Sequence, residues 1–177
     1  MTHSIITRMF CQALVLIAVL AVATVDAAEL IQVIHGPDTG SIEKLAASEL
    51  ADILGRVFND VEVRSGGAPE RQPEAETIIF VGNPDTNPGI ARNNFDWPKV
   101  SDQGIAIVSN GEQKRHAVGG GSPAGTLWAV YELGHRLGIR YLLRGDIDPL
   151  SKRAFDLSGI DTTIEPQVRQ RGWETLG

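Results

Sequence analysis

The sequence predicts an α/β (α+β) fold in which two amphipathic helices pack on one mixed β-sheet. Two observations lead to this prediction. Two segments carry apolar residues at helical spacing, and each follows a β-rich run and a turn. Further short β-rich runs lie between and after these two segments. A single sheet with both helices against it is the most economical way to bury these apolar faces.

Residues 1–27 are typical of a secretory signal peptide and are predicted to precede the fold. Arg8 gives a weakly basic start, residues 9–22 are almost uninterrupted apolar, and Val25-Asp26-Ala27 suits a signal peptidase. The apolar run is shorter than the roughly 20 residues that span a bilayer. We therefore expect export to the periplasm or the extracellular space, with no membrane attachment after cleavage; a retained membrane anchor is the alternative.

The composition limits how the remaining residues can be stabilised and what they bind. Cys11 is the one cysteine and lies inside the predicted signal peptide, so the exported part contains no disulfide. A hydrophobic core must stabilise it, and its length is sufficient for one domain. The net charge is −6. Since binding to a phosphate backbone needs clustered Lys and Arg, we expect no nucleic-acid partner.

The first half of the fold should begin with a strand over residues 29–35 and a turn over 36–40. Ser41 is predicted to cap a helix that ends before Asn59-Asp60. Polar residues occupy one side of this helix, and its apolar stripe consists of Ile42, Leu45, Ala46, Leu50, Ile53, Leu54 and Val57.

The middle of the chain should contain short strands and two long loops. A short strand is expected over 61–64, an exposed loop over 65–76, and a second long loop over 82–99. The strand predicted between these loops, TIIFV at 77–81, is continuously apolar and β-rich, which predicts burial on both faces. Strands over 104–109 and 115–118 should then form a hairpin about Asn110-Gly111.

The second helix has the clearest boundaries. Ser122 is the predicted cap, and Pro123 occupies the first helical position, where its missing amide hydrogen costs nothing. Gly138 fits a left-handed C-terminal cap, with Ile139 folding back onto the last turn. The inner stripe is predicted to be Leu127, Val130, Tyr131, Gly134 and Leu137. Two further strands are expected, over residues 140–143 and within 155–164.

The glycine turn before this helix admits two interpretations. Gly119, Gly121 and Ala124 match a loose G-x-G-x-x-A pattern, whose helix N-terminus could bind a phosphate. Thr126, however, stands where a Walker lysine is required, and Asp146 is poorly placed for a ribose. We favour the second interpretation, in which the glycines allow a sharp turn and close packing of helix on strand.

The sequence indicates no catalytic residue, no metal site and no cofactor. His35, His116 and His135 are far apart, and no pair has ligand spacing. There is no G-x-S-x-G nucleophile elbow. Acidic residues are plentiful, but a catalytic carboxylate pair needs a cleft about 5 to 10 Å across, which two helices on a sheet do not provide.

Two tryptophans are candidate platforms for stacking a sugar. Trp128 lies in the second helix, and we expect it to serve in helix packing. Trp97 lies in a loop between Asp96 and Pro98, and both interpretations stay open for it.

The order of these motifs resembles the non-catalytic N-terminal domain of family-20 β-hexosaminidases and family-67 α-glucuronidases. In that family a glycine turn precedes a helix of the form G-x-x-x-A-x-x-x-L-x-x-x-L-G and a strand with arginine and aromatics. The matching residues here are Gly125, Ala129, Leu133, Leu137-Gly138 and Ile139-Arg140-Tyr141. Residues 46–54 are similar to the family's first helix, and 79–82 to the strand and glycine that follow. The resemblance implies an accessory domain over residues 28–165.

The C-terminal segment resembles the start of the catalytic barrel in the same enzymes. Pro166 to Gly172 is similar to the Pro-x-aromatic-x-x-Arg-Gly start of the first barrel strand, although Val168 replaces the aromatic. Arg171 matches the arginine that binds sugar hydroxyls. Trp173 and Glu174 are similar to a Trp-Asp pair of family-67 enzymes. The resemblance implies that these three residues bind substrate only when a barrel is present.

The resemblance also leads to a functional expectation. A barrel takes at least about 200 residues, whereas residues 166–177 supply only its truncated start. We therefore expect a non-catalytic accessory domain of a secreted glycoside hydrolase that acts in carbohydrate metabolism. Alone it should hydrolyse nothing, and its barrel-facing surface should be apolar and exposed. The expected partner is a catalytic barrel, in cis or on a neighbouring polypeptide. The alternative is a stand-alone extracytoplasmic module that binds a glycan or a protein.

Overall fold

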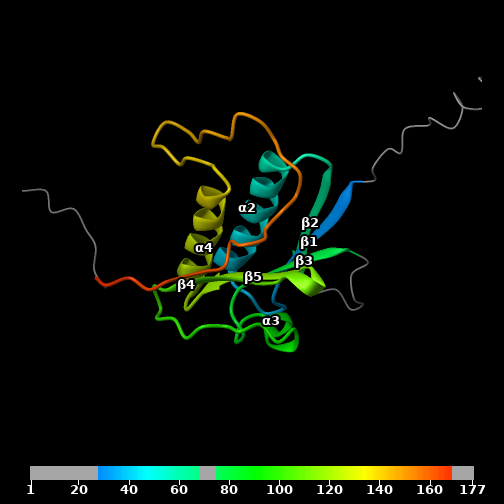
Figure 1. The fold of residues 1–177 in the computed structure, drawn as a ribbon. Helices are drawn as coiled ribbons and strands as arrows, with labels where there is room; N and C mark the ends of the chain where they lie inside the picture. The colour runs from blue at the N-terminus through cyan, green and yellow to red at the C-terminus, as the bar shows by residue number, and fades with distance from the viewer. Residues whose placement is uncertain (1–27, 68–74, 169–177) are drawn as a thin grey trace, which may run out of the picture.

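The computed structural model describes residues 28–67 and 75–168. These residues form one six-stranded mixed sheet with two long helices, α2 and α4, on one face (Figure 1), which confirms the predicted fold class. The strands are β1 (Glu29–His35), β2 (Val61–Gly67), β3 (Thr77–Val81), β4 (Ile105–Asn110), β5 (Arg115–Gly120) and β6 (Thr162–Ile164). The helices are α2 (Ser41–Val57), α3 (Pro88–Arg92) and α4 (Pro123–Arg136). The predicted signal peptide lies outside the described residues.

The strand order across the sheet is β2-β1-β3-β5-β4-β6. Strands β2, β1, β3 and β5 are parallel, whereas β4 pairs antiparallel with β5 and β6. Parallel neighbours need a crossover connection, and α2 supplies it between β1 and β2. Because α2 and α4 each follow a strand of the parallel set, the two helices run in the same direction across the sheet (Figure 1).

The main core lies between the sheet and helices α2 and α4. Alternate residues of each inner strand point into it, as the two-residue period of a strand requires. Strand β3 is buried on both faces, as predicted. The fully or almost fully buried residues of this helix-side core include Ile31, Val33, Ile79, Val81 and Val118 from the strands and Leu50, Leu54, Val130 and Leu133 from the helices.

A smaller core lies on the opposite face of the sheet, under α3. Ile34, Phe80 and Ala117 point to this side and contact Ile90 of α3. The segment 82–99 was predicted to be a loop, and the presence of α3 within it corrects that prediction. Asn87 is the local cause: its side chain accepts a hydrogen bond from the amide of Gly89 at 3.1 Å and so caps the helix.

Helix α4 begins and ends where the sequence predicts. The Ser122 hydroxyl accepts a hydrogen bond from the Gly125 amide at 3.1 Å, and Gly138 has a φ of +109°. Ile139 is fully buried and its amide donates to the Gly134 carbonyl. The predicted inner stripe is partly wrong: Val130, Gly134 and Leu137 are buried as predicted, whereas Leu127 and Tyr131 are only partly buried. The buried residues are Gly125, Thr126, Ala129, Val130, Leu133 and Gly134.

The first helix and its N-cap lie one residue earlier in the chain than predicted. Ser41 is the first helical residue, and Gly40 occupies the cap position without any side-chain hydrogen bond. Strand β2 also runs beyond the predicted residue 64, because its pairing with β1 continues to His35 and Gly67.

The two strands predicted after α4 are mostly absent. Residues 140–143 form no strand, since Arg140 pairs only with Ile147 in an isolated bridge that turns the chain away from the sheet. Of 155–164, only Thr162–Ile164 joins the sheet, as β6. The pairing of β6 with β4 does not extend to Ser109. The Ser109 amide donates its hydrogen bond to the Asp161 carboxylate at 2.6 Å and not to a main-chain carbonyl.

Candidate functional site

Main-chain carbonyl groups from other parts of the chain pack directly against the glycine turn. A Cβ atom at Gly119 would overlap the carbonyl of Gly82, and one at Gly121 would overlap the carbonyl of Ser101. The amide of Gly121 already donates to the Gly104 carbonyl at 3.1 Å. These contacts support the packing interpretation of the glycines over the phosphate-binding one.

The carboxyl ends of the parallel strands, where open α/β sheets usually bind ligands, are closed by a polar network. Glu43, only 2 % exposed, accepts a hydrogen bond from the Thr86 hydroxyl at 2.8 Å. The Thr86 hydroxyl in turn accepts from the Asn83 amide, and the Asn83 side chain donates to the Gly120 carbonyl at 3.0 Å. Among the described residues, these polar groups thus hydrogen-bond to one another.

The outward side of the helix layer carries large apolar side chains in solvent. Ile42 and Leu45 of α2 were predicted to belong to its apolar stripe, but they are 43 % and 47 % exposed, which corrects that prediction. Trp128 of α4 is 46 % exposed. Tyr131 lies at the seam between the helices, where burial and the nearby Glu49 carboxylate raise the pKa of its hydroxyl. Leu45 and Trp128 each lie about one turn before Glu49 and Tyr131, so they are at about the same height along the two helices. We call Ile42, Leu45 and Trp128 the outer helix face.

A shallow groove of about 410 Å³ continues from Trp128 along α4. We call it the α4 groove. It is lined by Gln103, Ile105, Trp128, Tyr131, Glu132, His135, Tyr141, Ile164 and Pro166. Its aromatic end is an edge-to-face pair of Tyr131 and Tyr141, with ring centroids 5.1 Å apart. Its other end reaches Pro166, the first residue of the segment that resembles a barrel start.

Tyr141 lines this groove, but its hydroxyl is buried and not satisfied. Among the described residues its hydroxyl has no hydrogen-bond partner, and it lies against the Cα position of Gly134. Burial raises the pKa of Tyr141 to about 12, with Asp146 adding to the effect. The hydroxyl therefore stays protonated at neutral pH.

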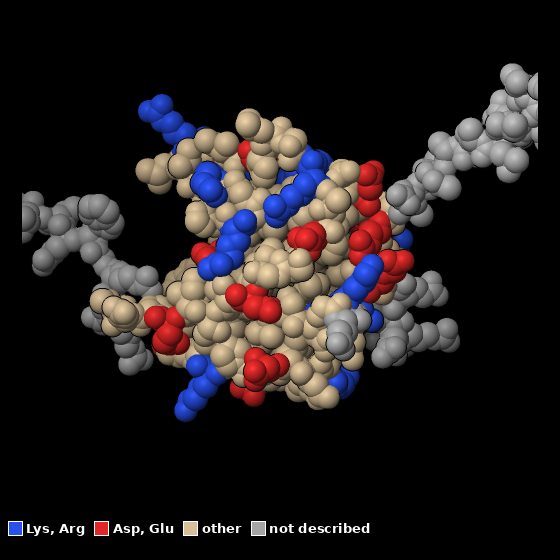
Figure 2. All heavy atoms as spheres, in the orientation of Figure 1, with Lys and Arg blue, Asp and Glu red and all other residues tan. Residues whose placement is uncertain are grey.

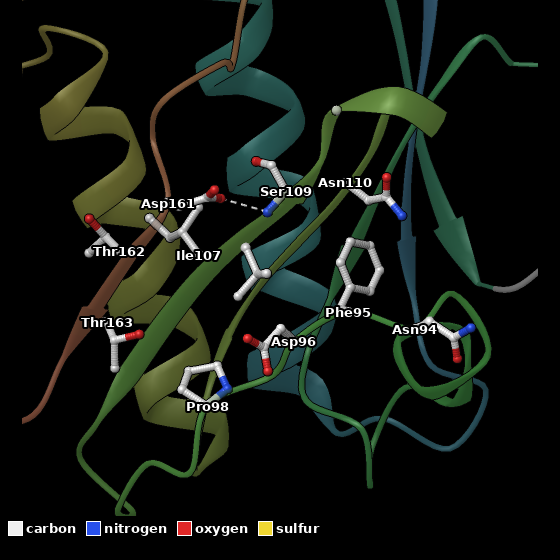
Figure 3. A pocket seen from close by; sticks show the side chains of 12 residues that line it. Asn94, Phe95, Asp96, Pro98, Ile107, Ser109, Asn110, Asp161, Thr162 and Thr163 are labelled. Carbon is white, nitrogen blue, oxygen red and sulfur yellow. Dashed lines mark hydrogen bonds between the residues drawn. The ribbon is translucent and has the colours of Figure 1, made fainter.

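A second hollow, of about 660 Å³, lies at the C-terminal half of β4 (Figure 3). We call it the β4 hollow. Three segments surround it: the loop after α3, the second half of β4 with its turn, and the residues at the start of β6. Its lining consists of Asn94, Phe95, Asp96, Pro98, Ile107, Val108, Ser109, Asn110, Gly111, Asp161, Thr162 and Thr163.

A hydrogen-bonded pair lies behind this hollow. The Ser109 hydroxyl and His116 Nδ1 are 2.9 Å apart across the β4–β5 pairing. Burial lowers the pKa of His116 to about 4, although the nearby Asp161 carboxylate opposes the shift. His116 is therefore neutral at pH 7, and the pair links two strands.

The described residues were also compared with the requirements of a metal site and of a membrane span. Across residues 28–67 and 75–168, no three His, Cys, Asp or Glu side chains are grouped so that they could hold a metal. In the same residues, no helix has the length and apolar character needed to cross a membrane. Figure 2 shows basic and acidic side chains interspersed on the viewed face, with wide uncharged areas between them.

The structure places the two candidate tryptophans differently. Trp97 is half-buried and packs against the smaller core with Phe95, which favours a structural role. Trp128 was expected to pack within the helix layer, and its 46 % exposure corrects that expectation. The predicted substrate-binding residues Arg171, Trp173 and Glu174 lie outside the described residues. The β4 hollow was not predicted, because the sequence does not show that β6 pairs with β4.

No protein-family model matches the chain, and no curated protein does. Among solved structures, it is similar to a family GH115 4-O-methyl-alpha-glucuronidase with specificity for decorated arabinogalactans (15% identity, TM-score 0.49, 64% of this chain and 14% of that one). It is also similar to CpGH84D (14% identity, TM-score 0.42, 68% and 19%). A third is a GH138 enzyme targeting pectin rhamnogalacturonan II (18% identity, TM-score 0.37, 62% and 10%). The chain thus spans less than a fifth of each protein, and similarity at this level assigns no function.

Proposed function

We propose that this chain is a non-catalytic accessory domain of an exported glycoside hydrolase. In this proposal the outer helix face packs against a catalytic barrel, carried in cis or on a neighbouring polypeptide. The observation that carries the proposal is the exposure of Ile42, Leu45 and Trp128 on one side of the helix layer. The order of sequence motifs, which resembles the N-terminal domain of family-20 and family-67 enzymes, supports it independently.

The exposed side chains have the character of an interaction surface. Burying a Leu or Ile side chain is worth about 1.5–3 kcal/mol, and tryptophan is among the residues that contribute most binding energy at interfaces. Ile164 of β6 is 38 % exposed beside the α4 groove. The chain passes from there to Pro166, so a barrel that follows this segment would start next to the same surface.

The accessory domain would act by supporting the barrel, not by chemistry of its own. Packing against one side of the barrel restricts the loops and strand ends that shape a substrate cleft. Arg171, Trp173 and Glu174 would contribute to sugar binding only after the barrel is in place. We infer that the chain alone cleaves no glycosidic bond.

The test starts from the coding sequence that follows codon 177, which should encode a barrel in frame or in the next gene. The barrel polypeptide and this chain are expressed separately, and their association is measured by calorimetry. Leu45→Glu and Trp128→Glu should each weaken binding roughly 10- to 100-fold, because a charge replaces an apolar contact. Aryl hexosaminides and aldobiouronic acids should be turned over by the barrel and not by this chain.

Leu143→Glu is the matched control. Leu143 is fully exposed but lies on the segment after α4, away from the outer helix face, so this variant should bind the barrel normally. The proposal fails if no barrel is encoded downstream. It also fails if Leu143→Glu weakens association while Leu45→Glu and Trp128→Glu do not.

A stand-alone binding module is the second candidate, and the aromatic residues that line the α4 groove favour it. Trp128, Tyr131 and Tyr141 offer ring faces and edges to a ligand, as sugar-binding grooves do. Glycan binding by the isolated chain that Trp128→Ala abolishes, together with no barrel downstream, would establish this function instead.

A further inference from the structure

We propose that the β4 hollow is a binding site for a neutral oligosaccharide. The proposal goes beyond the accessory function, because the hollow is on the other side of the sheet from the outer helix face. Phe95, which lines the hollow, packs against the α3-side core, and Val108 and Asn110 point to that side because Ile107 points into the helix-side core. Ile107, Ser109 and Thr162 form the margin of the hollow at the edge of the sheet. A barrel that covered the outer helix face would leave the hollow open.

The charges of the hollow exclude most anionic ligands. Asp96 and Asp161 both line it, and among its described lining residues there is no lysine or arginine. Phosphate, sulfate and nucleic-acid ligands are held by clustered Lys and Arg. A glycan that bears uronic acids would face the same repulsion. The charges of the lining therefore do not favour an anionic ligand.

The arrangement of polar and apolar groups fits a sugar. The rings of Phe95 and Pro98 supply apolar lining, and Asp96 lies between them in Figure 3. Asn110 and Thr163 provide donors and acceptors around this lining. A pyranose ring has a C–H face that packs on an aromatic ring and an edge of hydroxyls that donate to carboxylates and amides. Ligand sites typically combine an apolar lining with a few fixed polar groups in this way.

Two contacts hold the hollow in shape before a ligand binds. The Asp161 carboxylate is fixed by the Ser109 amide at 2.6 Å, a hydrogen bond drawn in Figure 3. The Phe95 ring packs edge-to-face on Phe80 of β3, with centroids 6.0 Å apart. Because these side chains are already ordered, a ligand would lose little affinity in ordering them.

The test uses amide NMR spectra of the purified chain, titrated with neutral xylo-, galacto- and chito-oligosaccharides. A glucuronic-acid-bearing xylo-oligosaccharide of the same length is the anionic comparison. At least one neutral probe should shift the amides of Asn110 and Thr163 with an affinity near or below about 1 mM, which corresponds to about −4 kcal/mol. The anionic probe should bind more weakly.

Three variants decide where the probe binds. Phe95→Leu keeps an apolar side chain against Phe80 but removes the ring, and should weaken binding roughly threefold to tenfold. Asp96→Ala removes a charged acceptor and should weaken it about tenfold or more. Asp85→Ala is the matched control, since Asp85 is exposed in the same connection but does not line the hollow.

Shifts at the hollow that weaken in Phe95→Leu and Asp96→Ala, but not in Asp85→Ala, support the proposal. It is overturned if no neutral probe shifts these amides. It is likewise overturned if the shifts centre on Trp128, or if Asp96→Ala binds as well as the unchanged chain. None of these measurements involves a barrel, so failure here is distinct from failure of the accessory function.

Discussion

At the scale of single residues, Tyr141 and Gly134 form a tight pair whose coupling can be measured. The Tyr141 hydroxyl has no hydrogen-bond partner among the described residues and lies where a Cβ of residue 134 would be. Tyr141→Phe should therefore raise the free energy of unfolding by about 1 kcal/mol, because it removes an unsatisfied buried polar group. Gly134→Ala alone should lower it by about 1–3 kcal/mol through overpacking.

The double variant is the critical measurement. In the Tyr141→Phe background the atom nearest to the new Cβ is gone, so Gly134→Ala should be tolerated much better. Urea unfolding of the four proteins gives the coupling energy directly. Additive effects of the two substitutions would mean that the hydroxyl and the helix glycine do not contact each other.

The lowered pKa of His116 predicts how the free energy of unfolding depends on pH. Burial lowers its pKa from 6.5 to about 4 in the folded state. As the pH falls through 6.5, the unfolded chain binds a proton that the folded chain does not, so stability decreases. The loss between pH 6.5 and 4 should approach about 3 kcal/mol.

His116→Gln should remove most of this loss while keeping a side chain able to hydrogen-bond Ser109. His135→Gln, at an exposed position of α4, is the control and should retain the loss. Urea unfolding between pH 4 and 7 makes the comparison. Equal pH dependence in His116→Gln and the unchanged chain would show that the buried imidazole is not its source.

At the scale of elements, the two long helices differ in how they begin. Ser122 caps α4 and also donates to the Asp102 carbonyl at 2.5 Å, whereas Gly40 at the start of α2 has no side chain to use. Ser122→Ala should cost about 1–2 kcal/mol. Gly40→Asp should gain about 0.5–1 kcal/mol, since Gly40 has a φ of −72° and a new Cβ meets nothing within 4 Å.

Thermal and urea unfolding of both variants check this asymmetry, with Gly40→Ala separating the effect of the cap from that of a less flexible unfolded chain. A Gly40→Asp protein no more stable than Gly40→Ala would mean that the first turn of α2 does not use the new carboxylate.

The elements also show which features a sequence can predict. Ser122, Pro123 and Gly138 act within one turn of their own positions, so the boundaries of α4 follow from local chemistry. Whether residues 140–143 form a strand depends on the pairing of Arg140 with Ile147, which the β-rich run itself does not indicate. A β-rich run therefore predicted a strand that the fold does not contain. The network that joins Glu43 to Thr86 was likewise hidden by its separation along the chain.

The candidate sites, too, depend on contacts between residues that are far apart in the sequence. Exposure of an apolar surface was expected from the resemblance, but its residues could be named only after the seam between α2 and α4 was known. The β4 hollow depends on the register that sets Ala106 opposite Thr163 and on a side chain, Asp161, that replaces a ladder hydrogen bond. Neither feature has a period or motif that can be read from residues 155–164.

At the scale of the whole molecule, the two faces of the sheet differ in what they leave available. Helices α2 and α4 cover the parallel strands and carry an apolar outer surface, whereas α3 covers only the centre of the opposite face. The strands β4 and β6 therefore remain open on the α3 side, where the lining is polar and acidic. An apolar surface favours a permanent protein contact, and a polar open one favours a reversible soluble ligand. Both proposals follow from this division, since a domain that docks through its helices can still present a sugar site on the far side of its sheet.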